Sequence, residues 1–306
     1  MTDRRRLTLV LLLALSAAAG GGAPAGAEPA SGPPGAAAPA PSDSALESRL
    51  LQERRAEESR FSILPHRPNY LLPLAWNRSP DAGTFAASGA GGRPDRAEVK
   101  FQISLKTPLW DNVLGSRGTL YAAYSQLSFW QAYNGAESSP FRETNYEPEL
   151  FLAFRTGKEF AGWASRLAAV GIDHQSNGRS GPLSRSWNRV VAVLLFSRGD
   201  WYVTVRPWWR IPERASEDDN PGMERFYGYG ELLVLRKLGE HTATAMFRNN
   251  LRASGNKGAV QADWSFPLHR KIRGYVQYFN GYGESLVDYA HSANRIGIGV
   301  LVADWL

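Results

Sequence analysis

The chain has 306 residues, enough for one large domain or two small ones. It contains no cysteine, which excludes disulfide bonds, thiol-based metal sites and a cysteine nucleophile. The formal net charge is +6 at pH 7, but arginine and lysine are scattered along the chain, so we expect no nucleic-acid partner. The 30 glycines and the 11% of aromatic residues favour an outer-membrane β-barrel, with basic side chains in the lumen and near anionic lipid headgroups.

Residues 1–27 have the pattern of a secretory signal peptide. Three arginines from Arg4 onward supply the charged start, residues 7–18 form an apolar run, and Ala25-Gly-Ala27 offers small residues at a cleavage position. Neither this run nor any later segment reaches the ~20 apolar residues of a transmembrane helix, so any spanning must be done by strands. A retained N-terminal anchor is the alternative for this segment.

Residues 28–68 are predicted to form a periplasmic linker and N-terminal extension. Up to Ser42 the segment is rich in alanine, proline and glycine without an apolar period, which indicates a flexible linker. Residues 44–60 carry mixed charge and three leucines, a pattern that allows one short helix.

From Asn69 to the C-terminus the sequence alternates between apolar and polar residues, the period of strands with two different faces. Residues 99–106 alternate without error, and Ile296, Ile298, Val300 and Val302 alternate with other residues near the C-terminus. Most segments are close to the ~9–11 residues that a tilted spanning strand needs. We predict twelve strands, near 69–76, 97–110, 117–133, 146–156, 162–176, 187–197, 201–211, 224–237, 242–249, 258–266, 272–280 and 294–306.

The connections between these segments are alternately short and long, as expected for periplasmic turns and external loops. An even number of strands places both chain ends on the periplasmic side and puts the segments 137–140 and 174–188 at the same, outer end. The sequence therefore predicts an all-β fold, a transmembrane antiparallel β-barrel of about twelve strands over residues 69–306. A soluble β-sandwich is the alternative that alternation alone leaves open.

One hairpin carries the residues of a hydrolytic site. His174 and Ser176 share a strand face, and a turn at Gly178 and Gly181 lets the next strand bring Asn188 beside His174. This trio continues the apolar faces of both strands, which in a barrel with an apolar outside is the lipid side. The plainer interpretation is a polar loop without chemistry.

The sequence of residues 171–189 is similar to the active-site segment of outer membrane phospholipase A, of the phospholipase A1 family. The similarity extends from about Asn69 to the C-terminus. Further segments that resemble this family are Phe129-Trp-Gln, Glu137-Ser-Ser-Pro-Phe-Arg-Glu-Thr-Asn-Tyr-Glu-Pro148, Phe160-Ala-Gly-Trp163 and Asn280-Gly-Tyr-Gly-Glu-Ser285. The resemblance implies an outer-membrane enzyme that hydrolyses acyl esters of phospholipids, with phospholipase A1, A2 and lysophospholipase activity.

The chemistry expected of the trio is that of a Ser-His-Asn triad. Ser176 becomes a nucleophile when His174 takes its proton, and Asn188 fixes the imidazole tautomer without adding a full charge. The backbone N–H of Gly178 is a candidate donor to the oxyanion of the tetrahedral intermediate.

The resemblance further implies a calcium cofactor at the interface of an active homodimer. The matching ligands are the hydroxyl of Ser184, the carbonyl of Arg179 and the carbonyl of the partner subunit's Ser138; oxygen ligands suit Ca²⁺. Gln126 corresponds to a polar residue of the lipid-facing dimer interface. It shares parity with Trp130, and a lumen-facing side chain is its alternative.

Two rival functions remain at this stage. One is a non-enzymatic barrel of the same fold, a pore or a structural protein, which would have no use for this polar set on its outside. The other is a soluble secreted esterase, which would lack the barrel.

Overall fold

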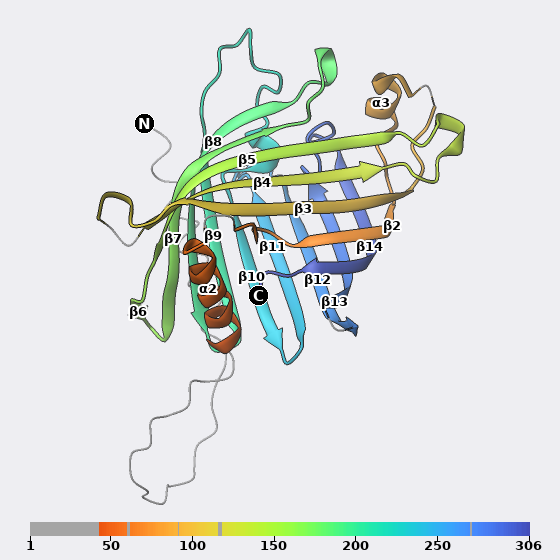
Figure 1. Cartoon of the computed structure of the whole chain (residues 1–306). Coiled ribbons are helices and arrows are strands. Elements are labelled where there is room, and N and C mark those ends of the chain that lie inside the picture. The colour runs from red at the N-terminus through yellow and green to blue at the C-terminus, as the bar shows by residue number, and fades with distance from the viewer. Residues whose placement is uncertain (1–42, 60–61, 91, 116–117, 270) are drawn as a thin grey trace, which may run out of the picture.

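The fold is a closed β-barrel. The structure is a computed structural model that describes residues 43–59, 62–90, 92–115, 118–269 and 271–306, so the predicted signal peptide and the predicted flexible linker up to Ser42 lie outside the described residues (Figure 1). The barrel strands are β2 (Asn69–Asn77), β3 (Ala97–Trp110), β4 (Gly118–Trp130), β5 (Phe141–Arg155), β7 (Trp163–Ser176), β8 (Ser186–Arg198), β9 (Trp201–Arg210), β10 (Gly230–Leu238), β11 (His241–Asn249), β12 (Gly258–His269), β13 (Ile272–Tyr282) and β14 (Ser292–Ala303).

Every barrel strand pairs antiparallel with its neighbours, and β14 pairs with β2 to close the ring. Two short strands lie outside the ring: β1 (Leu64–Pro65) pairs with β3, and β6 (Glu159–Phe160) pairs with β7. Closure satisfies the backbone hydrogen-bonding groups of every strand, which a membrane requires of any spanning sheet. The predicted twelve-stranded barrel is confirmed, and the soluble β-sandwich was the wrong alternative.

The alternation in the sequence separates the outside of the barrel from its lumen. On β7, Ile172 is 56% exposed and its neighbour Asp173 is 3% exposed. On β14, Ile298 is 54% exposed and Arg295 is 3% exposed. An apolar outside around a polar interior is the arrangement of outer-membrane barrels.

Two strand starts differ from the prediction by five or six residues, and the other strand boundaries differ by three residues or fewer. The predicted strand at 224–237 begins only at Gly230, because residues Glu224–Tyr227 form the helical turn α4, whose Tyr227 packs inward with its ring centroid 5.1 Å from that of Trp187. β5 begins at Phe141, inside the predicted loop, because the Phe141 ring stacks on Trp130 at 5.5 Å and extends the β4–β5 hairpin.

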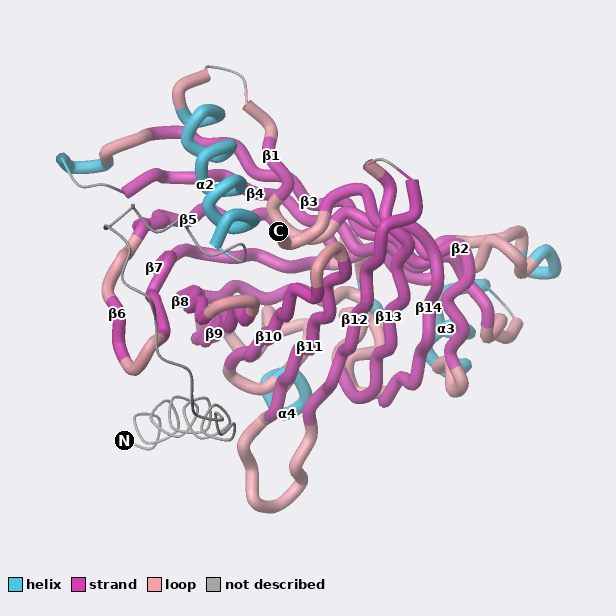
Figure 2. The backbone as a smooth tube through the Cα atoms, turned by 90° about the horizontal axis from the view of Figure 1, so that it is seen from below, coloured by secondary structure: helices cyan, strands magenta, loops and turns pink. Residues whose placement is uncertain are grey.

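Helix α2 (Asp43–Glu57) lies against the barrel at the end that carries the short turns (Figure 2). Its Leu46 is buried against β9 and β10, and the Arg49 guanidinium donates to the carbonyl of Asp304 at 2.7 Å. Glu53 forms an ion pair of 2.8 Å with Lys106 of β3. The helix therefore ties strands from different parts of the ring to the C-terminal residues.

The other helical segments are short and lie in the connections between strands. They are α3 (Ala82–Phe85), η1 (Ala86–Ala90), η2 (Val113–Gly115), η3 (Gly135–Glu137), η4 (Gly181–Leu183) and α4. No helix among the described residues is long and apolar enough to cross a bilayer.

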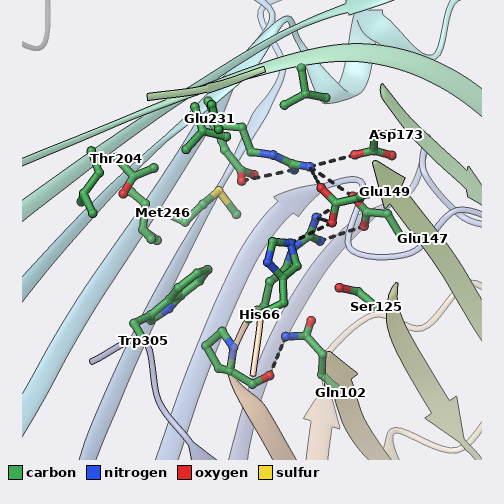
Figure 3. A pocket seen from close by; sticks show the side chains of 18 of the residues that line it. His66, Gln102, Ser125, Glu147, Glu149, Asp173, Thr204, Glu231, Met246 and Trp305 are labelled. Atoms are coloured by element: carbon green, nitrogen blue, oxygen red, sulfur yellow. Dashed lines mark hydrogen bonds and ion pairs between the residues drawn. The ribbon is translucent and has the colours of Figure 1, made fainter. Parts of the chain in front are cut away.

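Charged side chains gather in the lumen. Three carboxylates, Glu147, Glu149 and Asp173, offer oxygens within 4.8 Å of one another, which is the spacing of a metal site. Three arginines contact these carboxylates, which Figure 3 labels: Arg67 lies 2.8 Å from Glu147, and Arg206 lies 2.8 Å from Asp173. Arg189 reaches Asp173 at 2.9 Å. Since three guanidiniums balance three carboxylates, we interpret the cluster as a structural ion network; a cavity of about 390 Å³ lies beside it.

A second network fixes the outer end. Glu284, in the β13–β14 connection, accepts from Lys100 at 2.9 Å and from Arg295 at 2.8 Å. Burial alone would raise the pKa of Glu284, but the charges of Arg295 and Lys100 hold this pKa at about 2. The carboxylate is therefore ionised at neutral pH and anchors the connection to β3 and β14.

Candidate active site

The β7–β8 hairpin brings the predicted base and its orienting amide into contact. His174 and Asn188 are directly opposite in the strand register, and His174 Nδ1 lies 2.9 Å from Asn188 Oδ1. Because an amide oxygen only accepts, this contact assigns the N–H to Nδ1 and leaves Nε2 free to take a proton. The pair shares the outer face of the strands with the exposed Ile172 and Val190.

Ser176 is the last residue of β7 and pairs with Ser186 across the hairpin. Its side chain is half-buried on the parity of His174. No hydrogen bond joins the Ser176 hydroxyl to His174 in the described part of the chain. Catalytic hydrogen bonds are often long before substrate is bound, so the placement is compatible with a nucleophile beside its base.

The loop that follows Ser176 is ordered by one buried side chain. Asn177 donates its amide to the carbonyl of Leu183 at 2.9 Å, and its oxygen accepts from the N–H groups of Arg185 at 3.0 Å and Arg179 at 3.3 Å. Its own N–H donates to the Arg185 carbonyl at 3.0 Å. These bonds span the whole turn, so they fix the residues between them.

Gly178 occupies a position where a side chain would be strained. Its φ is +65°, and a Cβ there would lie 3.1 Å from the Tyr146 ring. The N–H of Gly178 is not engaged by the described residues, and its role as a donor to the oxyanion stays a prediction.

The residues matched to calcium ligands lie on two outer loops. The Arg179 guanidinium donates to the carbonyl of Arg142 at 2.6 Å and lies 3.3 Å from Glu143, contacts that hold the Arg179 backbone in place. The Ser184 hydroxyl donates to Asp219 Oδ2 at 2.5 Å. Ser138 follows η3 in the β4–β5 connection with φ of +59°, and no described donor engages its carbonyl.

Gln126 lies on the outer face of β4, and not in the lumen. It shares parity with the exposed Tyr124 and Trp130. The Tyr124 hydroxyl donates to its oxygen at 3.1 Å, and its amide nitrogen donates to Ser128 at 3.1 Å. A polar row thus runs along the outside of this strand.

Two acidic residues of the β9–β10 connection join the site although sequence reasoning did not select them. Asp219 accepts from Ser184, and Glu213 Oε1 accepts from the Asn188 amide at 3.2 Å. They lie 35 and 25 residues from these partners along the chain. The acidic composition of residues 213–219 was the available signal, but nothing local directs that loop toward the hairpin.

Comparisons with known proteins agree with the resemblance that the sequence motifs indicated. The family model described as Phospholipase A1 matches residues 46–302. The chain belongs to the phospholipase A1 family. The phospholipase A1 of Klebsiella pneumoniae is 41% identical over 255 residues, covering 83% of this chain and 86% of that protein. The phospholipase A1 of Escherichia coli K12 is 40% identical over 259 residues, covering 83% and 85%.

Solved structures of this phospholipase A1 family have the same barrel. Outer membrane phospholipase A from Escherichia coli matches with a TM-score of 0.77 and 38% identity, covering 83% of this chain and 97% of that one. A calcium-bound dimer of the Salmonella typhi outer membrane phospholipase matches with a TM-score of 0.75 and 40% identity, covering 82% and 96%. The chain is an outer-membrane barrel that hydrolyses phospholipids, which rules out the soluble esterase and disfavours the pore.

Proposed function

We propose that this barrel is a calcium-dependent phospholipase whose Ser176, His174 and Asn188 form a triad on the lipid-facing side. The observation that carries the proposal is the 2.9 Å contact between His174 Nδ1 and Asn188 Oδ1, with Ser176 two residues further along the same face. Neighbouring Ile172 is exposed on that face, so an acyl chain in the bilayer can approach the site without leaving lipid. A related Escherichia coli structure carries an asparagine-to-alanine change described as an active-site mutation, which supports the role of Asn188.

The chemistry follows from the positions of these atoms. His174 Nε2 takes the proton of Ser176 Oγ as this oxygen attacks the ester carbonyl carbon. The Gly178 N–H stabilises the resulting oxyanion. His174 then gives its proton to the leaving alcohol, which frees the lysophospholipid, and a water deprotonated by His174 releases the fatty acid from Ser176. Acyl esters at either position, and those of lysophospholipids, present the same carbonyl to this machinery.

Calcium fits the outer loops by the chemistry of the donor set. The candidate ligands are the Ser184 hydroxyl, the Arg179 carbonyl and the Asp219 carboxylate, all of them oxygens. A bound cation would add positive charge near the developing oxyanion. Asn177 and the contacts of the Arg179 side chain hold two of these ligands in one turn.

Dimerisation would complete the site. The partner subunit's Ser138 would supply a further carbonyl, and Gln126 would lie in the lipid-facing interface with its polar groups already satisfied within β4. The calcium-bound dimer of the Salmonella typhi relative supports this assembly. An enzyme embedded in its own substrate gains an off state when a monomer lacks part of its ligand set.

The test is Ser176→Ala in purified detergent-solubilised protein, with fatty acid release from phospholipid measured in calcium and again in excess chelator. Activity should fall by about 10³-fold or more, because single triad deletions elsewhere cost nearly as much as removing the set. Ser180→Ala is the matched control, since Ser180 is an exposed serine of the same loop. Near-full activity of Ser176→Ala, or activity indifferent to chelator, would overturn the corresponding part of the proposal.

A further inference from the structure

Glu213 is held beside the outer side of Asn188 by an extension of the sheet. β9 ends at Arg210, but the Ile211 N–H still donates to the carbonyl of Asn188 at 2.8 Å. Pro212 follows, and the side chain of Glu213 then reaches the Asn188 amide nitrogen at 3.2 Å. The position of this carboxylate is thus set by backbone pairing to the same residue that it contacts.

A carboxylate at this place decides which way the asparagine faces. An asparagine side chain can present either its oxygen or its NH₂ group to a neighbour, and the two orientations have nearly the same shape. An ionised Glu213 only accepts hydrogen bonds, so it selects the orientation with the NH₂ group toward itself. In that orientation the oxygen points to His174 Nδ1, as the 2.9 Å contact requires.

The charge of Glu213 is not cancelled by its surroundings. Its side chain is 17% exposed, and its other oxygen, Oε2, is buried without a hydrogen-bond partner among the described residues. The nearest cation is Arg210 at 3.6 Å from this oxygen, but Arg210 also contacts Asp218 at 2.6 Å and Glu224 at 3.3 Å. One guanidinium therefore faces three carboxylates, and the group as a whole keeps a negative charge.

A Ser-His-Asn triad lacks the negative charge that an aspartate would contribute when the imidazole becomes positive. We propose that Glu213 is a positioning residue that orients Asn188 and supplies this charge to His174 through the asparagine amide. The inference rests on the proposed triad. It extends the relay to Ser176, His174, Asn188 and Glu213, with the last member contributed by a loop outside the hairpin.

The test compares Glu213→Ala with Glu213→Gln and Glu213→Asp in the full-length protein, folded in detergent, at saturating calcium. Loss of a charge-assisted hydrogen bond should lower kcat about 10- to 100-fold for Glu213→Ala, with KM changed less than about twofold, because the proposed role of Glu213 is exerted on Asn188 and not on substrate binding. Glu213→Gln keeps an acceptor but loses the charge, so its kcat should fall between Glu213→Ala and wild type. Glu213→Asp keeps the charge and should recover part of the rate.

The matched control is Glu217→Gln, which removes one charge from an exposed position of the same loop. It should leave kcat within about twofold of wild type. A similar fall in both variants would mean that loop charge in general, and not the contact with Asn188, affects the rate. Equal rates of Glu213→Ala and wild type would overturn the inference outright.

A double-mutant cycle separates this inference from the triad itself. Asn188→Ala alone should lower kcat, and adding Glu213→Ala should lower it no further, because Glu213 acts through Asn188. If Asn188→Ala is as fast as wild type, the proposed triad fails. Asn188→Ala could instead be slow, with the added Glu213→Ala lowering kcat by the same factor as it does in the wild type. In that case the triad stands and the positioning role of Glu213 fails.

Discussion

The buried side chain of Asn177 offers the sharpest test of how the outer loop is held. Asn177→Ala removes three side-chain hydrogen bonds, to Leu183, Arg185 and Arg179, from a side chain that is 5% exposed. At about 1 kcal/mol of net stability each, the ordered loop loses about 3 kcal/mol relative to open forms. That is a factor of about 100 in the population ratio. The barrel itself should remain folded, because the strand pairing of β7 with β8 is untouched.

The consequence should appear in the calcium dependence of hydrolysis. The loop carries two proposed ligands, so calcium must offset the cost of ordering it, and the calcium concentration for half-maximal rate should rise by up to about 100-fold. Asn177→Asp keeps the accepting oxygen and loses only the donation to Leu183, so it should require about 5-fold more calcium. The assay is the initial rate of fatty acid release across a calcium titration.

The control is Asn256→Ala, which removes an exposed asparagine whose side-chain contacts are with Asn249 at the end of β11 and with Arg252 in the β11–β12 connection. Its calcium titration should overlay that of the unmodified protein. The reasoning is refuted if the calcium titration of Asn177→Ala also overlays that of the unmodified protein, while gel mobility with and without heating shows that the barrel of this variant is folded.

Three further outcomes are expected. Asn188→Ala should lower turnover strongly but less than His174→Ala, because an unoriented base still accepts a proton; equal and complete loss in initial-rate assays would contradict a purely orienting role. Ser184→Ala should need more calcium for the same rate. Because linkage is reciprocal, calcium should also tighten the dimer, which sedimentation in detergent with a substrate analogue would detect. A monomer–dimer balance that does not change with calcium would exclude the shared site. Burial would raise the pKa of Glu53, but Lys106 and other cations lower it, so its ion pair stabilises the docking of α2 above about pH 4.5 and is lost as the pH falls through the depressed folded-state value. Glu53→Gln should therefore speed trypsin cleavage within α2 at neutral pH, and an unchanged rate would show that the ion pair does not hold the helix.

The strands and their two faces could be predicted because this information is local. Side chains at i and i+2 point the same way in any strand, so Ile296 and Ile298 had to share a face whatever the rest of the chain did. Their exposure and the burial of Arg295 follow once the outside is lipid. The two strand starts that differ most from the prediction, after residues 224–229 and at Phe141, were not predicted because aromatic contacts set them: Tyr227 packs against Trp187 of another strand, and Phe141 stacks on Trp130 across the same hairpin.

The hairpin of the site was predictable for the same reason, and its surroundings were not. The spacing of His174, Ser176 and Asn188 implies one face and one register as soon as residues 177–185 form a turn. The sequence alone did not determine that the turn would be held by Asn177.

The sequence by itself thus determined the alternation, the barrel class and the polar trio on the apolar face, since each depends on neighbours a few residues apart. The tertiary structure decided which distant groups meet: Glu213 and Asp219 reach the hairpin, arginines balance the carboxylates of the lumen, and α2 docks against β3 and the C-terminal residues. These contacts join residues 25 to more than 200 positions apart. They exist because closing a ring of twelve tilted strands fixes the loop ends in space, and no pattern within a single segment records that geometry.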